Sequence, residues 1–89
     1  MSLKGRIYSV LIVSAAGNLN TALTALLPES KYAPVHVVSN ISAAKRAFVQ
    51  RAYDYVIVNA PLPDDMGTRF AIDACGSIGT VVLLMVRGE

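Results

Sequence analysis

Four short apolar runs alternate along the chain with three segments whose apolar residues recur at helical spacing. The runs cover residues 7–13, 34–38, 55–59 and 80–86. The first is continuous and rich in β-branched residues, which is typical of a strand buried on both faces of a parallel sheet. The order strand, helix, strand, repeated to a fourth strand, predicts an α/β fold built on one parallel sheet.

The intervening segments have the periodicity of amphipathic helices. In residues 18–27 the apolar positions are Leu19, Ala22, Leu23, Leu26 and Leu27. Pro28 ends this pattern, because proline disfavours helical geometry in the residue before it. Ser39 or Asn40 can cap a second helix, whose apolar face comprises Ile41, Ala44, Ala47 and Phe48 and whose charged residues Lys45, Arg46 and Arg51 face water. A third helix is predicted over about 67–75.

Composition narrows the class of protein. The chain has 89 residues, enough for one core, and 54% of them are hydrophobic. No apolar run approaches the roughly 18–20 residues of a membrane span, and no secretory signal opens the chain. The single cysteine, Cys75, fits a reducing compartment, so we expect a cytoplasmic protein. The net charge of +2 is spread without a basic run, so we expect no direct contact with nucleic acid.

Residues 55–67 read Tyr-Val-Ile-Val-Asn-Ala-Pro-Leu-Pro-Asp-Asp-Met-Gly and are the most informative segment. A β-branched strand ends at Asn59, the turn Leu62-Pro63-Asp64 follows, and Gly67 stands eight residues beyond Asn59. This pattern resembles the third strand and following loop of a response-regulator receiver domain, in which an aspartate accepts a phosphoryl group where Asn59 stands. The resemblance implies a flavodoxin-like, doubly wound parallel sheet with strand order 2-1-3-4.

The same resemblance locates the other positions that phosphorylation needs. The acidic pair that holds Mg²⁺ after the first strand corresponds to Ser14 and Ala15, a hydroxyl and a methyl. The Thr or Ser that contacts the phosphoryl group after the fourth strand corresponds to Met85, with the register fixed by Arg87-Gly88-Glu89. An amide has no anionic oxygen for nucleophilic attack, and a thioether is a poor hydrogen-bond partner. The family's lysine lies on a fifth strand that this chain does not reach.

These substitutions predict a degenerate, pseudo-receiver domain over residues 1–89, part of a longer regulator and lacking the final strand and helices of a complete receiver. The phrase from Asn59 to Leu62 and the lost acidic pair make it similar to the amino-terminal domain of ANTAR-type antitermination regulators. We expect a signal-transduction module without enzymatic activity, cofactor or metal. It would act through a protein partner or self-association as a homodimer, since one face of the sheet and the edge of the fourth strand would be left uncovered.

The alternative is a small-molecule sensor that uses the crevice formed by Ser14, Ala15 and Asn59. Asn59 would then anchor an uncharged ligand, whereas in the favoured interpretation it only hydrogen-bonds a loop. An enzyme or nucleotide binder is the least favoured reading, because no acid and base are paired in the sequence and no glycine-rich loop has the required spacing. The segment Ser14-Ala-Ala-Gly17 is more typical of a plain turn than of a turn that cradles a phosphate.

The remaining polar or reactive residues have structural interpretations. Asp64 and Asp65 precede the third helix, where carboxylates complement the positive end of the helix dipole, so a metal site is not favoured. Cys75 has no neighbour in sequence that would activate its thiol, so packing is expected. Tyr53 and Tyr55 are expected to pack in the core. A lone histidine, His36, makes no motif.

Overall fold

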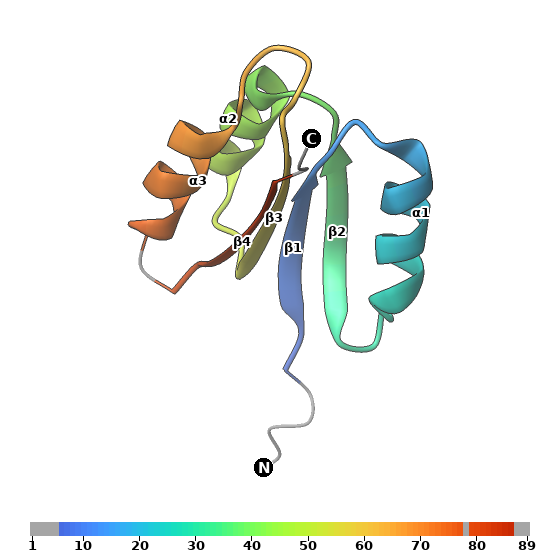
Figure 1. Cartoon of the computed structure of the whole chain (residues 1–89). Helices are drawn as coiled ribbons and strands as arrows, with labels where there is room; N and C mark the ends of the chain where they lie inside the picture. The colour runs from blue at the N-terminus through green and yellow to red at the C-terminus, as the bar shows by residue number, and fades with distance from the viewer. Residues whose placement is uncertain (1–5, 78, 87–89) are drawn as a thin grey trace.

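Four parallel strands and three helices make up the described part of the chain, residues 6–77 and 79–86 of a computed structural model (Figure 1). In chain order the elements are β1 (Tyr8–Val13), α1 (Gly17–Leu26), β2 (Tyr32–Val38), α2 (Ile41–Gln50), β3 (Tyr55–Ala60), α3 (Thr68–Cys75) and β4 (Val81–Val86). The strands lie in the order β2-β1-β3-β4. The predicted α/β class, the parallel sheet and the 2-1-3-4 order are therefore confirmed.

The second strand is longer than its apolar run indicated. It begins at Tyr32, which pairs with Tyr8, and the register shifts between Tyr8 and Val10. Pro34 therefore lies inside the strand. Because β2 is at the edge of the sheet, a residue without a backbone N–H is tolerated there. The sequence pattern could not reveal this, since a proline normally reads as a strand boundary.

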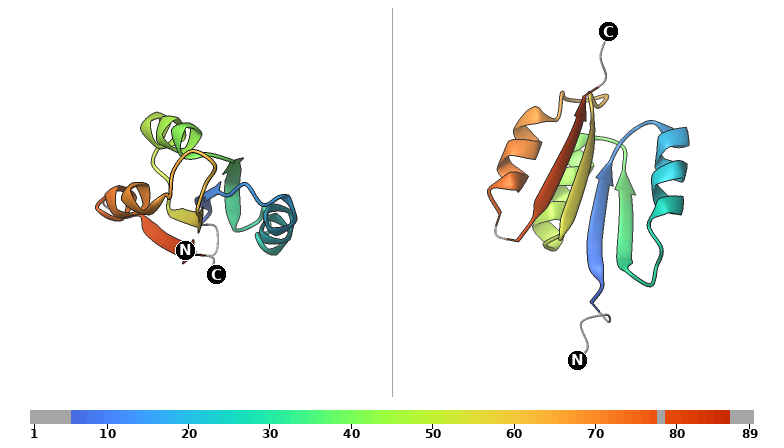
Figure 2. Two further views of the ribbon diagram at one scale, coloured as in Figure 1. Left: turned by 45° about the horizontal axis from the view of Figure 1, so that its top comes forward. Right: turned by 60° about the horizontal axis from the view of Figure 1, so that its bottom comes forward.

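The hydrophobic core lies between the sheet and the helices α2 and α3, which share one face (Figures 1 and 2). Alternate residues of β1 and β3 point to this face, as the pleat of a strand requires. Its buried members are Leu11, Val13, Ile41, Ala44, Tyr53, Val56, Val58, Leu62, Phe70 and Ala71. The predicted apolar face of α2 supplies four of the residues in or against this cluster, with Ala47 and Phe48 at its margin.

Helix α1 lies on the opposite face of the sheet, beside β2 (Figure 1). The predicted helix is present, but none of its residues is buried, and Leu26 is 73% exposed. The strand residues on this side, Val10 and Ile12, are nevertheless buried. Periodicity therefore identified the helix correctly but did not show how much surface it would bury, which depends on how closely the neighbouring layer approaches.

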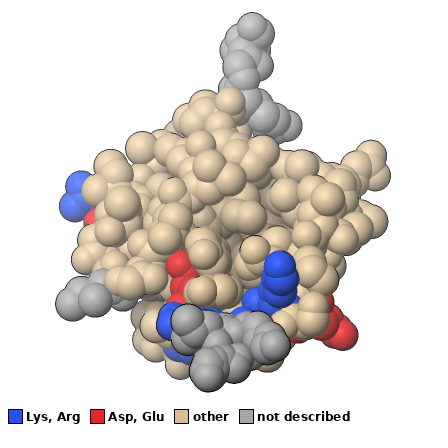
Figure 3. Space-filling view, turned by 90° about the horizontal axis from the view of Figure 1, so that it is seen from below, with Lys and Arg blue, Asp and Glu red and all other residues tan. Residues whose placement is uncertain are grey.

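Much apolar surface remains exposed around β4. Val81, Leu83 and Val86 are 58%, 55% and 62% exposed. In a view from below, most of the visible surface carries neither basic nor acidic side chains (Figure 3). Exposed apolar residues that gather on one strand favour a site of protein interaction.

Candidate functional site

The carboxyl ends of β1 and β3 meet where the chain order reverses, since β2 lies on one side of β1 and β3 on the other. Such a switch point is where open α/β sheets bind their ligands. Asn59 is near the end of β3, and Ser14 directly follows β1. The amide Nδ2 of Asn59 donates a hydrogen bond of 3.2 Å to the Oγ of Ser14, and both residues are buried, with 5% and 0% exposure.

Ser14 is fixed by further hydrogen bonds. Its backbone N–H donates to the carbonyl of Val38 at 2.9 Å, and its own carbonyl accepts from Nδ2 of Asn20 at 2.9 Å. Its Oγ also accepts from the backbone N–H of Ala16 at 3.2 Å. A hydroxyl oxygen has two lone pairs, and here both face protein donors. Ser14 therefore joins β1, β2, β3 and α1, and its oxygen is poorly placed to hold a metal ion.

Ala15 and Met85 complete the predicted crevice. Ala15 lines a cavity of about 160 Å³ together with Ala16, Asn59 and Pro61. Met85 stands beside Asn59 in the pairing of β3 with β4 and is partly buried. The structure thus brings the four predicted positions to one end of the sheet, and the side chains of Ala15 and Met85 carry no ionisable group. Their correspondence to receiver positions stays a prediction.

The sequence interpretation missed Asn20. This residue lies in α1, whose leucine spacing predicted a helix. Its Nδ2 donates a hydrogen bond to the carbonyl of Ser14. Its Oδ1 is buried and has no hydrogen-bond partner among the described residues. A polar residue on the inner side of an otherwise apolar helical pattern is the signal that could have identified it.

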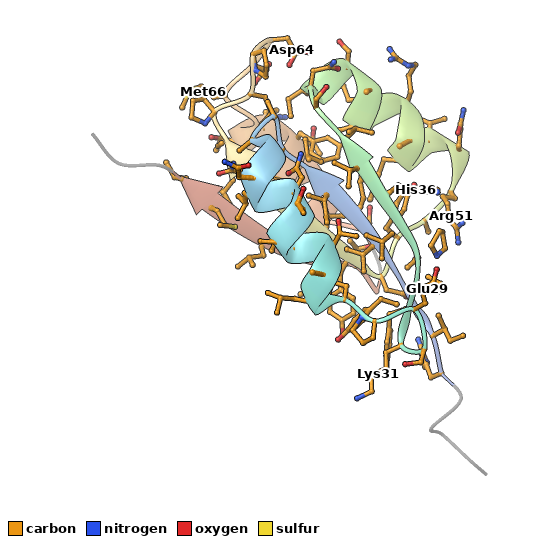
Figure 4. The ribbon with its side chains drawn as sticks, turned by 90° about the vertical axis from the view of Figure 1, so that its right-hand side faces the viewer. Glu29, Lys31, His36, Arg51, Asp64 and Met66 are labelled. Carbon is orange, nitrogen blue, oxygen red and sulfur yellow. The ribbon has the colours of Figure 1, made fainter. Side chains whose placement is uncertain are left out.

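The loop after β3 returns to cap α2 rather than α3. The carboxylate of Asp64 accepts hydrogen bonds from the backbone N–H groups of Ile41 at 2.8 Å and Ser42 at 3.0 Å. These bonds lower the pKa of Asp64. Asn40 caps the same helix by accepting from the N–H of Ala43 at 2.8 Å. The predicted complement to a helix dipole is present, but it serves the preceding helix. Figure 4 shows Asp64 and Met66 at this end of the molecule, with Glu29 and Lys31 at the other.

Asp65 shapes the turn before α3. Its Oδ1 accepts from the N–H of Gly67 at 2.9 Å, and its carbonyl accepts from the N–H of Leu62 at 2.8 Å. Gly67 has a φ of 90°, and a Cβ there would lie 3.2 Å from Leu62 Cδ2 and 3.3 Å from Val58 Cγ1. Only glycine meets both conditions without strain. Within residues 6–77 and 79–86, no three His, Cys, Asp or Glu side chains gather as metal ligands.

The three residues that were expected to pack, Tyr53, Tyr55 and Cys75, differ in how far they are buried. Tyr53 is buried as expected, its ring stacks on Phe48, and its hydroxyl lies 2.7 Å from Nδ1 of His36. Burial raises the pKa of Tyr53, and the nearby Arg51 guanidinium acts in the opposite direction. Tyr55 is only partly buried. The packing expected of Cys75 was wrong, because this residue is exposed.

The exposure of Cys75 follows from the geometry of α3. This helix buries Phe70, Ala71 and Ala74 against the sheet. Each further residue turns by about 100° around the helix axis, so the next side chain after Ala74 leaves the buried face. Cys75 therefore meets solvent.

The fold, but not the sequence, has a counterpart among known proteins. No protein-family model and no curated protein matches the sequence. Among solved structures, an aspartate-to-alanine mutant of the response regulator MaeR, bound to sulfate, matches with a TM-score of 0.80. The match covers 93% of this chain and 70% of that chain, at 19% identity. This chain has a receiver fold.

This is the fold that the resemblance of residues 55–67 implied. At 19% identity the likeness concerns the fold alone. None of the three helices in the described ranges is long and apolar enough to cross a membrane.

Proposed function

We propose that this chain is a pseudo-receiver, a signalling module that keeps the receiver fold and does not accept a phosphoryl group. The proposal is carried by the hydrogen bond between Asn59 and Ser14. Receiver chemistry needs a carboxylate nucleophile on β3 and a carboxylate after β1 that helps to hold Mg²⁺. Here an amide and a hydroxyl occupy these places and satisfy each other.

The electrostatics of the crevice support this proposal. Transfer of a phosphoryl group places negative charge in the site, which Mg²⁺ must neutralise. Mg²⁺ requires oxygen ligands in nearly octahedral geometry and usually takes one or two carboxylates from the protein. The cavity beside Asn59 is lined otherwise by Ala15, Ala16 and Pro61, whose side chains supply no oxygen. A divalent cation would have no charged ligand there.

The first prediction is that the chain gains no phosphoryl group from acetyl phosphate and Mg²⁺. Intact mass measurement after incubation tests this, with an authentic receiver domain treated in parallel as a positive control. The Asn59→Asp variant should also remain unmodified, because residues 14 and 15 still provide no carboxylate. A labile gain of one phosphoryl mass in the wild-type chain would contradict the proposal.

Acting without phosphorylation, the module would work by protein association in the cytoplasm, as a regulatory domain and not as an enzyme. The exposed apolar residues of β4 and the weakly charged surface in Figure 3 support contact with a protein, including a second copy of this chain. The finer assignment, to the amino-terminal domain of an ANTAR-type antitermination regulator, rests on the resemblance of the phrase from Asn59 to Leu62. RNA contact would then belong to another domain.

A second candidate function is a sensor of a small uncharged ligand. The buried Oδ1 of Asn20, which lacks a partner in the described chain, favours it, because buried polar atoms normally have one. The cavity of about 160 Å³ argues against it, since drug-sized ligands occupy roughly 300–1,000 Å³. Thermal-shift screening of metabolites against wild type and Asn59→Ala separates the two functions. A ligand-induced shift that Asn59→Ala abolishes would establish the sensor.

A further inference from the structure

A groove of about 450 Å³ lies between helices α2 and α3. Helix α2 packs on β1 and β2, and α3 packs on β3 and β4 (Figures 1 and 2). The groove therefore lies over the middle of the sheet and not at one of its edges. Its floor is apolar, because the rings of Phe48 and Phe70 meet there edge to face, with centroids 5.9 Å apart. Ala74, which is also buried, lines the groove with them.

The two rims of the groove carry opposite charges. Lys45 and Val49 line its α2 side, and Asp73 lines its α3 side. Val49 is 86% exposed, the largest fraction among the large apolar side chains in the part of the chain that the structure describes. A single exposed apolar residue is ordinary, but this one stands directly beside an apolar groove. The α2 rim thus offers a cation and an apolar projection, and the α3 rim offers an anion.

Asp73 already takes part in an ion pair within the chain. Its Oδ1 lies 3.4 Å from Nε of Arg69, one helical turn earlier. Both side chains are mostly exposed, and an exposed pair of this kind contributes little to stability. A carboxylate has two oxygens and about four lone pairs, so it can accept hydrogen bonds from a second cation. The pair with Arg69 therefore leaves Asp73 available to a partner.

We propose that a second copy of this chain docks on this groove, with α2 of each copy against α3 of the other. A two-fold axis that runs along the groove gives this arrangement, because it exchanges the two rims. Lys45 of each copy then faces Asp73 of the other, and each Val49 enters the groove of the other copy. The inference rests on the proposed role in protein association and names the partner and its contacts. The surface is distinct from the exposed residues of β4.

A second copy suits the groove because the two rims complement each other. A two-fold interface brings the same patch of both copies together, so the patch must match itself. Exchange of the rims joins a cation to an anion at both ends of the contact. It also covers Val49 with an apolar surface, which removes its side chain from water. A wholly acidic or wholly basic partner would match one rim and be repelled by the other.

Exchange of the charges tests the contact, with association measured by sedimentation velocity over a concentration series. The wild type should be a dimer at micromolar concentration. Lys45→Asp alone sets two acids against each other at both contacts, and Asp73→Lys alone sets two lysines. Each variant should self-associate roughly ten- to thirty-fold more weakly than wild type, because two exposed ion pairs become repulsive. An equimolar mixture of the two variants should associate like wild type, because each contact then joins an aspartate to a lysine.

The apolar part of the contact has its own matched pair of variants. Val49→Gln removes the exposed apolar side chain beside the groove and should weaken the dimer. Leu26→Gln is the control, because Leu26 is also largely exposed, at 73%, but lies on α1 at the opposite face of the sheet. It should leave the dimer intact. All substituted residues are exposed, so every variant should keep the far-ultraviolet circular dichroism spectrum of the wild type.

The inference is overturned by a monomeric wild type, by a dimer that neither charge change weakens, or by a mixture of Lys45→Asp and Asp73→Lys that does not recover association. These failures are separate from a failure of the pseudo-receiver proposal, which intact mass measurement tests. A monomeric chain that takes up no phosphoryl group overturns only the docking. A dimer that shows the expected charge dependence and gains a phosphoryl mass overturns only the loss of phosphotransfer.

Discussion

The hydrogen bond from Asn59 to Ser14 ties the ends of β3 and β1 together at the bottom of the crevice. A buried charge requires paired ligands or counter-charges. The amide and hydroxyl avoid this requirement because they are neutral and complementary. At the scale of single residues, the crevice is therefore a place where two neutral side chains join β1 and β3 by a buried hydrogen bond.

Replacing Asn59 by alanine should lower the free energy of unfolding by about 0.5–2 kcal/mol, through one lost buried hydrogen bond. Urea unfolding of wild type, Asn59→Ala, Ser14→Ala and the double variant gives the coupling energy of the pair. Sedimentation of Asn59→Ala should remain that of the wild type, because the substitution is buried and leaves the exposed residues Val81, Leu83 and Val86 in place. Additive effects of the two substitutions would show that the bond contributes nothing.

At the scale of elements, α2 depends on a residue far along the sequence. Its first turn receives two caps, Asn40 from the chain before it and Asp64 from the loop after β3. Backbone N–H groups at a helix start carry partial positive charge and favour a carboxylate. The cap therefore couples the start of α2 to the loop beside the crevice.

The cap that Asp64 forms makes the stability of the chain depend on pH. The backbone N–H groups lower the pKa of Asp64 in the folded chain, so its contribution to stability is fully present above the ordinary pKa that this carboxyl has in the unfolded chain. This contribution is lost as the pH falls through the pKa that Asp64 has in the folded chain. Asp64→Ala should therefore be less stable than wild type at pH 7, and the difference in stability should shrink at acidic pH.

Urea midpoints of wild type and Asp64→Ala from pH 7 to pH 2 measure this effect. Asp64→Asn is the matched control, since it retains one acceptor oxygen and removes the charge. It should fall between the other two at pH 7. A difference between wild type and Asp64→Ala that does not change with pH would contradict the assignment of the cap.

At the scale of the whole molecule, the sheet has one well-covered face and one poorly covered face. The buried cluster lies under α2 and α3, whereas α1 buries none of its own residues. A chain of this size can bury only roughly 60–65% of its unfolded surface, and 54% of its residues are hydrophobic. Under the proposed role in protein association, we expect the contact surface to include the exposed Val81, Leu83 and Val86 of β4.

The sequence by itself determined the strands, the helices and, through the receiver resemblance, the strand order. Period-two and helical spacing decide which side chains share a face, and these are local properties of the chain. The meeting of Ser14 with Asn59 also followed, because carboxyl ends of adjacent parallel strands must lie together.

Only the tertiary structure decided which loop meets which helix and how deeply each layer packs. Asp64 was read as a partner of the helix that follows it, yet the loop folds back onto α2. Asn20, Cys75 and the exposed α1 were misjudged or overlooked because burial depends on neighbours distant in sequence. Local patterns record the direction of a side chain, and the assembled layers decide what it touches.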